Sequence, residues 1–207
     1  MARLNVNPNR MELSRLKKRL VVAKRGHKLL KDKQDALIKA FLERAREAKA
    51  LREELESELM ACYRSFLLAR AQTLPVMLEQ ALMISGTHCN ISVARKNVMS
   101  VVVPEYTVEQ EGESFSYGLD TTQGRLDVAL ERFSILLPRL IALAAKEKAI
   151  RLMASEIEKT RRRVNALKHV MLPNFNETIR YITMKLDEQE RSTLSRLMKI
   201  KDIVRSH

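Results

Sequence analysis

The sequence predicts an all-α protein: a long antiparallel two-helix coiled coil with a short β-hairpin inserted at the bend. Residues 27–85 contain no glycine and one proline, and residues 125–207 contain no glycine and two prolines. Both runs place apolar residues at alternating spacings of three and four, which is typical of a coiled-coil seam. Aromatic residues are only 4% of the chain and charged residues 30%, a composition closer to a coiled coil than to a compact domain. We expect three segments: an N-terminal long helix in residues 1–85, a middle segment in 86–121 and a C-terminal long helix in 122–207.

The first helix is expected to begin within residues 7–12. Asn7 or Asn9 can cap it, Pro8 suits the first turn, and Glu12 follows Asn9 by three positions. The apolar seam then continues to Leu55 and broadens beyond it, which indicates more than one neighbouring helix there. The helix is expected to reach Leu74 or to pass Pro75.

The middle segment changes character, because its β-branched and aromatic residues favour extended structure. We expect a β-hairpin near residues 99–118 with a polar turn at 109–113 and its tip within 105–115. Asp120 and Gln123 are expected to start the second helix, which runs from about Thr122 to near Ile203.

Prolines and polar seam residues modify this simple picture. Pro138 and Pro173 each remove a backbone donor and are expected to bend the second helix locally. His27, Gln34 and Arg44 interrupt the seam of the first helix. They are expected to fix the register or to contact polar atoms of the opposite helix, unless a third party surrounds this stretch. A bend near residues 80–122 places Arg44 near Glu158 and His27 near Phe175.

The net charge of +13 is concentrated at the two chain ends. Residues 1–33 hold 11 Lys/Arg against 2 Asp/Glu, and residues 160–207 hold 11 against 5, whereas residues 34–159 hold 16 against 18. Antiparallel pairing collects this positive charge at one end, which is expected to bind an acidic partner or a polyanion.

No catalytic or cofactor signature is present in the sequence, and we expect a non-enzyme without cofactor or metal. The chain lacks a Walker A motif, a dinucleotide glycine fingerprint and HExxH. Cys62 and Cys89 have no metal-ligand spacing and are expected to be free thiols. The longest apolar stretch, residues 133–145, is broken by Pro138 and Arg139, so we expect no membrane insertion.

Long ordered motifs in both helices resemble the D subunit of the V-type and A-type rotary ATPases. The first helix carries LKKRL at 16–20 and AKRGHKLLKDK at 23–33, and the second carries EIEKTRRRVNAL at 156–167. Pro173 and the segments 178–182 and 186–191 continue the similarity, as does NVNPNR at the start, although the family more often has Thr where Asn9 stands. His169 also departs from the family pattern.

The resemblance implies a central rotor shaft that couples ATP hydrolysis or synthesis in a catalytic ring to rotation of a membrane ion-carrying ring. It implies a protein that is cytoplasmic and peripheral to the membrane. Its implied partners are the catalytic A and B subunits, the F subunit and the stalk subunit that seats the shaft on the membrane ring. The paired termini lie inside the ring, which makes the following cations candidate ring contacts: Arg10, Lys17, Arg25, Lys28, Lys31, Lys33, Arg161, Arg162, Arg163, Lys168 and Arg180. Candidate contacts for the F subunit lie on the neutral stretch: Leu55, Leu59, Phe66, Leu126, Leu130 and Phe133.

Two alternatives are weighed against this interpretation. A basic coiled-coil module would bind nucleic acid or an acidic surface, although base-stacking aromatics are missing from the basic segments apart from Phe175 and Tyr181. The related γ shaft of F-type ATPases carries a sizeable α/β domain between its helices, and the roughly 35 residues at 86–120 are too few for one. Because the basic segments have so few base-stacking aromatics, we expect no nucleic acid partner.

Overall fold

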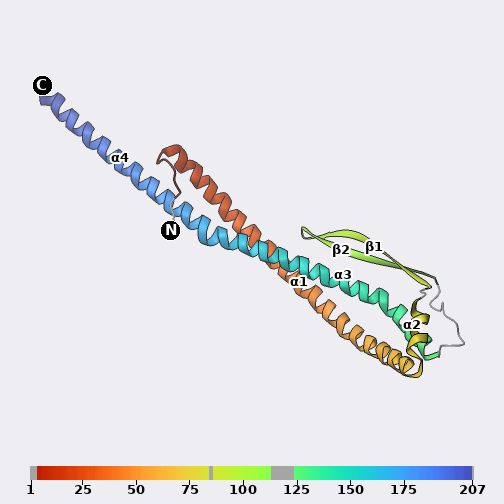
Figure 1. Ribbon diagram of the computed structural model, residues 1–207. Helices are drawn as coiled ribbons and strands as arrows, with labels where there is room; N and C mark the ends of the chain where they lie inside the picture. Colours follow the sequence, from red (N-terminus) through yellow and green to blue (C-terminus); the bar gives the residue numbers. More distant parts are fainter. Residues whose placement is uncertain (1–3, 84–85, 113–123, 207) are drawn as a thin grey trace. The chain divides into compact units, whose positions relative to one another are not determined.

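The computed structural model describes residues 4–83, 86–112 and 124–206. Its elements follow in the order α1 (Arg10–Gln72), α2 (Pro75–Met83), β1 (Thr87–Val98), β2 (Val101–Gly112), α3 (Gly124–Ala166), the π-helical turn η1 (Leu167–Met171) and α4 (Leu172–Ser206). Figure 1 labels the four α-helices and the two strands along the chain. The predicted fold class is confirmed: long helices dominate, and a two-stranded antiparallel hairpin separates them.

The start of α1 follows the predicted cap. The Asn9 side chain accepts a hydrogen bond from the Glu12 backbone N–H at 2.8 Å, so Asn9 satisfies one of the free donors of the first turn. Pro8 lies before the cap and not in the first turn. At the other end α1 stops at Gln72, and Pro75 opens α2, where its missing N–H costs no helical hydrogen bond. The first helix therefore ends slightly earlier than predicted.

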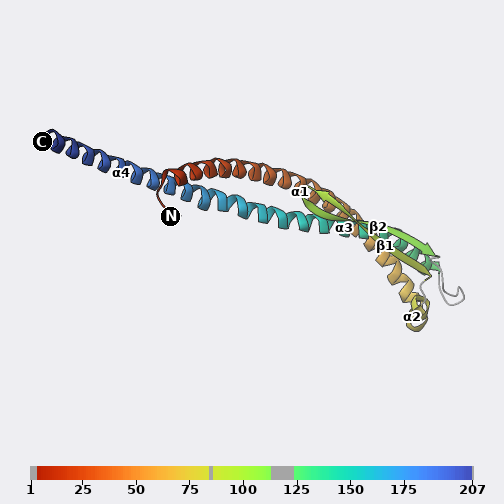
Figure 2. The same cartoon turned by 90° about the horizontal axis from the view of Figure 1, so that it is seen from above.

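The chain forms two compact units, each of which contains parts of both long helical runs. Unit 1 comprises residues 1–36 and 157–207, and unit 2 comprises residues 37–156. In unit 1, Leu16 packs with Phe175 and Ile182, and Arg10 forms an ion pair with Glu190. Lower numbers therefore pair with higher numbers, as antiparallel helices require. Figure 2 shows α4 continuing past the start of α1 within this unit.

In unit 2, α1 also runs antiparallel to α3. Leu55 packs with Leu136, and Arg139 donates hydrogen bonds to Glu54 at 2.7 Å and to Glu58 at 2.5 Å. Four of the five buried residues of α1 in this unit recur at seven-residue spacing: Ala48, Leu55, Cys62 and Ala69; the fifth is Leu37. This spacing is the heptad periodicity of a coiled-coil seam.

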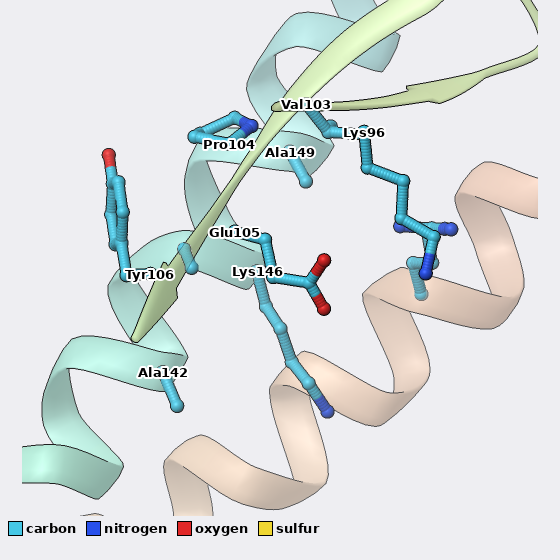
Figure 3. A pocket seen from close by; sticks show the side chains of 10 residues that line it. Lys96, Val103, Pro104, Glu105, Tyr106, Ala142, Lys146 and Ala149 are labelled. Carbon is cyan, nitrogen blue, oxygen red and sulfur yellow. The ribbon is translucent and has the colours of Figure 1, made fainter. Parts of the chain in front are cut away.

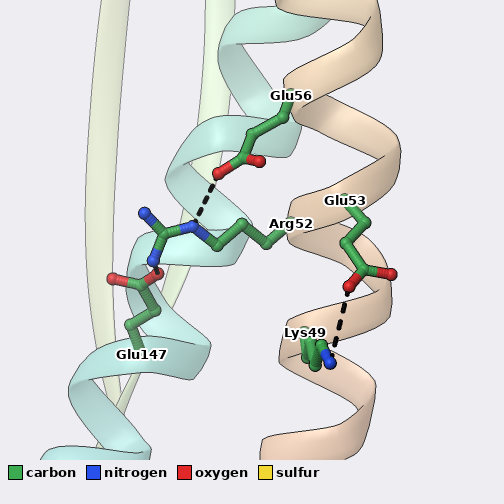
Figure 4. Close-up of polar contacts among 5 residues, drawn as sticks. All are labelled: Lys49, Arg52, Glu53, Glu56 and Glu147. Atoms are coloured by element: carbon green, nitrogen blue, oxygen red, sulfur yellow. Dashed lines mark hydrogen bonds and ion pairs between the residues drawn. The ribbon is translucent and has the colours of Figure 1, made fainter.

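Figure 4 shows hydrogen bonds and ion pairs between exposed polar side chains of the same helices. Arg52 donates to Glu56 at 2.9 Å and reaches across to Glu147 on α3 at 3.3 Å. The hydrogen bond to Glu56, followed by the negative charges of Glu147 and Glu56, raises the pKa of Arg52. Lys49 and Glu53 form an i,i+4 ion pair at 3.7 Å.

The predicted helix register is wrong in unit 2. Arg44 lines a cavity with Lys146 and Ala149, so it does not face the predicted neighbourhood of Glu158. The physical reason is that α1 ends at Gln72 and not near residue 80, which moves the fold-back point toward the N-terminus.

One of the roles considered for the seam residue His27 is not seen in the structure. Its Nε2 atom is buried, and no hydrogen-bond partner for it exists within the described residues. The expected contact between His27 and a polar atom of the opposite helix is therefore not formed through Nε2. Arg44 and Gln34 are half-buried.

The hairpin lies earlier in the sequence than predicted. Its strands pair from Thr87 with Gly112 to Val98 with Val101, and the turn is formed by Met99 and Ser100, both at positive φ (52° and 72°). This turn is not predictable from local composition, because neither residue is the glycine or asparagine that positive φ favours. The polar segment 109–112 consequently belongs to β2, while residue 113 and the predicted start of the second helix at residues 120–123 lie outside the described residues.

The two prolines of the second helical run have different surroundings. Pro138 is accommodated inside α3. Pro173 follows η1, where the Leu172 N–H bonds to the Leu167 carbonyl. A proline ring clashes with the carbonyl four residues before it, and a π-helical turn relieves such crowding by widening the backbone.

Candidate interaction surfaces

The net positive charge of the chain lies in unit 1. It holds 23 Lys/Arg against 9 Asp/Glu, a net charge of +14, whereas unit 2 holds 15 against 16, a net charge of −1. The structure places all eleven predicted ring-contact cations in unit 1. Ten of them are exposed and Lys33 is half-buried. This concentration gives unit 1 a strongly positive surface, which favours contact with acidic groups.

Most of these cations have no acidic partner of their own. Within the described residues, two of the eleven predicted cations form ion pairs: Arg10 with Glu190 and Arg162 with Glu158. The other nine remain available to an external acidic surface, because helical neighbours three or four residues away are themselves mostly basic or apolar.

A groove in unit 1 contains basic residues that the sequence analysis did not select. It has a volume of about 610 Å³ and runs between the first part of α1 and the segment from η1 to α4. Val22, Leu167, Met171 and Phe175 contribute its apolar lining. Its basic lining residues share one face of α1: Arg15, Lys18 and Arg19. Their spacing of three and four residues is the sequence signal that places them on one face of the helix.

Unit 2 carries an apolar groove that partly matches the contacts predicted for the F subunit. Four of the six predicted residues line it together with Cys62, Tyr63 and Ala129: Leu59, Phe66, Leu130 and Phe133. The groove has a volume of about 310 Å³, and 58% of Tyr63 and 44% of Phe133 are exposed. An exposed aromatic pair beside an apolar groove is characteristic of a surface that binds protein.

Leu55 and Leu126 do not belong to this surface. They are 1% and 0% exposed, and each packs inside a separate cluster, Leu55 with Leu136 and Leu126 with Ala69. Tyr63 was missed although it lies four residues after Leu59 on the same face of α1. Its polar hydroxyl kept it out of the apolar pattern.

The described residues contain no metal centre and no membrane-spanning helix. Across residues 4–83, 86–112 and 124–206, no group of three or more His, Cys, Asp or Glu side chains is arranged to hold a metal ion. No helix in the same residues is both long and apolar enough to cross a bilayer. Cys62 is buried and Cys89 is exposed, and both are free thiols.

Comparison with known proteins identifies the family of this chain. The sequence profile of the ATP synthase D subunit matches residues 12–202. The V-type ATP synthase D subunit of Thermoanaerobacter sp. (strain X514) is 52% identical over 99% of both chains. The V-type ATP synthase D subunits of Clostridioides difficile (53% identical, 99% of this chain and 93% of the relative) and Acetivibrio thermocellus (52%, 99% and 94%) are similarly related. The chain therefore belongs to the D-subunit family of the V/A-type rotary ATPases.

Proposed function

We propose that the chain is the central-stalk rotor shaft of a V/A-type ATPase, with no catalytic activity of its own. In this role it couples ATP hydrolysis or synthesis in the catalytic ring to rotation of the ion-carrying membrane ring. The observation that carries the proposal is the division of charge, +14 in unit 1 and −1 in unit 2. The basic unit 1 suits a moving contact with acidic ring subunits, and the nearly neutral unit 2 suits a fixed contact with the F subunit.

In this proposal the basic surface of unit 1 is the part of the shaft that changes the conformations of the catalytic interfaces. An asymmetric helix pair inside a three-fold ring presents different side chains to each of the three catalytic interfaces. Each interface then favours the conformation with which those side chains interact best. Exposed ion pairs contribute little individually, so the pairs between shaft and ring can break and re-form as the shaft turns.

Reconstitution tests the proposed role directly. The purified chain is mixed with a ring of catalytic A and B subunits, and complex formation is followed by size-exclusion chromatography together with ATP turnover. We expect one copy per ring and a changed turnover rate. Failure to bind the ring, combined with tight and salt-sensitive binding to DNA or RNA, would instead support the nucleic-acid alternative.

Charge reversal tests whether unit 1 faces the ring. Arg161, Arg162 and Arg163 are exposed, so changing all three to Glu is expected to reduce coupled ion transport with little change in melting temperature. The matched control reverses three exposed cations of unit 2: Lys39, Lys148 and Arg151. Normal coupling in the first variant would contradict the proposed contact.

The apolar groove of unit 2 is proposed to bind the F subunit. Asp substitutions at Leu59 and Phe133 place carboxylates in the groove and are expected to abolish this binding. Met60 and Ile135 are exposed apolar residues of the same helices that do not line the groove, so Asp substitutions there serve as the control. Equal loss of binding in both variants would rule out the groove as the specific contact. The stalk subunit that seats the shaft is proposed to bind near α2 and the hairpin.

A further inference from the structure

An open cavity of about 300 Å³ lies where the hairpin meets α1 and α3 in unit 2. Val103 is 3% exposed, and it lines the cavity with the small side chains Ala145 and Ala149 of α3. Val101 is also buried, at 6% exposed, and Gln110 donates to the Ser134 carbonyl at 3.1 Å. These contacts hold β2 against α3 within unit 2.

Strand geometry directs charged side chains into this cavity. Lys96 is directly opposite Val103 in the hairpin register, and opposite residues of an antiparallel pair share one face of the sheet. Glu105 follows Val103 by two positions and therefore lies on the same face. Figure 3 shows Lys96 extending from the hairpin toward α1, with the Glu105 carboxylate pointing into the space above Lys146. Arg44 lines the cavity from α1.

The charges in the cavity are unbalanced and mostly unpaired. Arg44, Lys96 and Lys146 contribute three cations, and Glu105 is the one carboxylate among the lining residues. Arg44, Lys96 and Glu105 form no ion pair or side-chain hydrogen bond within the described residues, although they surround the same space. Lys146 contacts Glu47 at 3.7 Å.

Further carboxylates lie next to this cavity and reduce its positive potential. Glu43 and Glu47 line an adjoining cavity that shares Arg44 and Lys146. A bound anion therefore has to carry enough charge to compete with these carboxylates. This requirement favours a divalent anion over chloride or a single carboxylate.

We propose that this cavity is a binding site for a phosphate group. A phosphate dianion in the cavity would accept hydrogen bonds from the Arg44 guanidinium and from the Lys96 and Lys146 ammonium groups at the same time. Within the described residues, no single carboxylate side chain bonds to all three of these cations. The three cations come from α1, β1 and α3, so a bound phosphate would tie the hairpin to both helices. The group can belong to free phosphate or to a nucleotide. The proposal stands independently of the rotor role.

Calorimetric titration of the full chain with inorganic phosphate, pyrophosphate and ADP tests the site, at an ionic strength matched with chloride. We expect saturable binding of at least one of these with a Kd of about 1 mM or tighter. Binding of free phosphate identifies the bare anion as sufficient, whereas binding of ADP alone identifies a nucleotide phosphate. Absence of saturable binding by all three overturns the proposal.

Three variants locate the site. Arg44→Ala and Lys96→Ala are each expected to weaken binding about tenfold, the loss that follows from removing one charge-assisted hydrogen bond. Arg95→Ala removes an adjacent exposed cation of β1 that does not line the cavity, and it is expected to leave binding unchanged. Equal effects of all three would mean that the anion senses only the overall charge, which contradicts a specific site.

Glu105 gives the proposal its sharpest test, because the sign of the effect separates two roles. If the cavity holds a phosphate group, Glu105→Gln removes a repulsive charge and is expected to tighten binding severalfold. If Glu105 is itself the anion that Arg44 and Lys96 hold, the same change frees the hairpin. Amide exchange at Val101 and Val103 would then accelerate without tighter phosphate binding, and the proposal would be wrong.

Discussion

Leu55→Ala is the perturbation whose consequence the structure defines best. The Leu55 side chain is 1% exposed and packs with Cys62 and Leu136. Truncation to Ala removes the apolar contacts of the deleted carbons and leaves a cavity, for which buried leucines lose about 2–5 kcal/mol. The surrounding residues Leu51 and Leu140 are only partly buried, so they can move into part of the space. We therefore expect a loss in the lower half of that range, about 2–3 kcal/mol.

Urea unfolding followed by far-UV circular dichroism measures this loss. With a slope of about 2 kcal/mol per molar urea, the midpoint is expected to fall by about 1–1.5 M. Leu59→Ala is the matched control, since Leu59 lies one turn later on α1 but is 37% exposed. It is expected to cost about 1 kcal/mol or less. Equal losses at the two positions, or a loss below about 0.5 kcal/mol at Leu55, would refute the assignment of Leu55 to the core.

Three further outcomes are expected. Burial raises the pKa of the Cys62 thiol, so the exposed Cys89 should react with a thiol reagent at neutral pH well before Cys62 does. Mass spectrometry of the labelled chain would show this order. Because the folded state favours the neutral Cys62 thiol, the stability that it contributes should be lost as the pH rises through its raised pKa. Asn9→Ala removes the cap of α1 and should lower the free energy of unfolding by about 1 kcal/mol in thermal unfolding, whereas Asn9→Ser should restore most of it. Thr178→Val removes the hydroxyl that accepts from the Leu4 N–H at 3.2 Å, so amide exchange at Leu4 should accelerate, and unchanged exchange would contradict that tether.

The candidate surfaces were only partly predictable from sequence. Charge counting alone located the basic unit, because Lys and Arg are concentrated near both chain ends. The apolar groove required burial information, since Leu55 and Leu59 have the same side chain and only packing separates core from surface. The phosphate-binding cavity was not foreseen at all, because Arg44, Lys96 and Lys146 are about fifty residues apart in sequence and meet only in the folded unit.

The sequence by itself determined the helices, the cap at Asn9 and the all-α architecture, because these depend on interactions within a few residues. The tertiary structure decided the register of the helices, the position of the hairpin and the residues that meet across elements. An apolar seam repeats every seven residues, so shifting one helix by a heptad leaves its hydrophobic contacts almost unchanged. What separates the registers is the set of specific contacts such as Arg139 with Glu54 and Glu58, together with the point where α1 ends at Gln72. Those contacts join residues that are distant in the chain, and their positions follow only from the folded backbone.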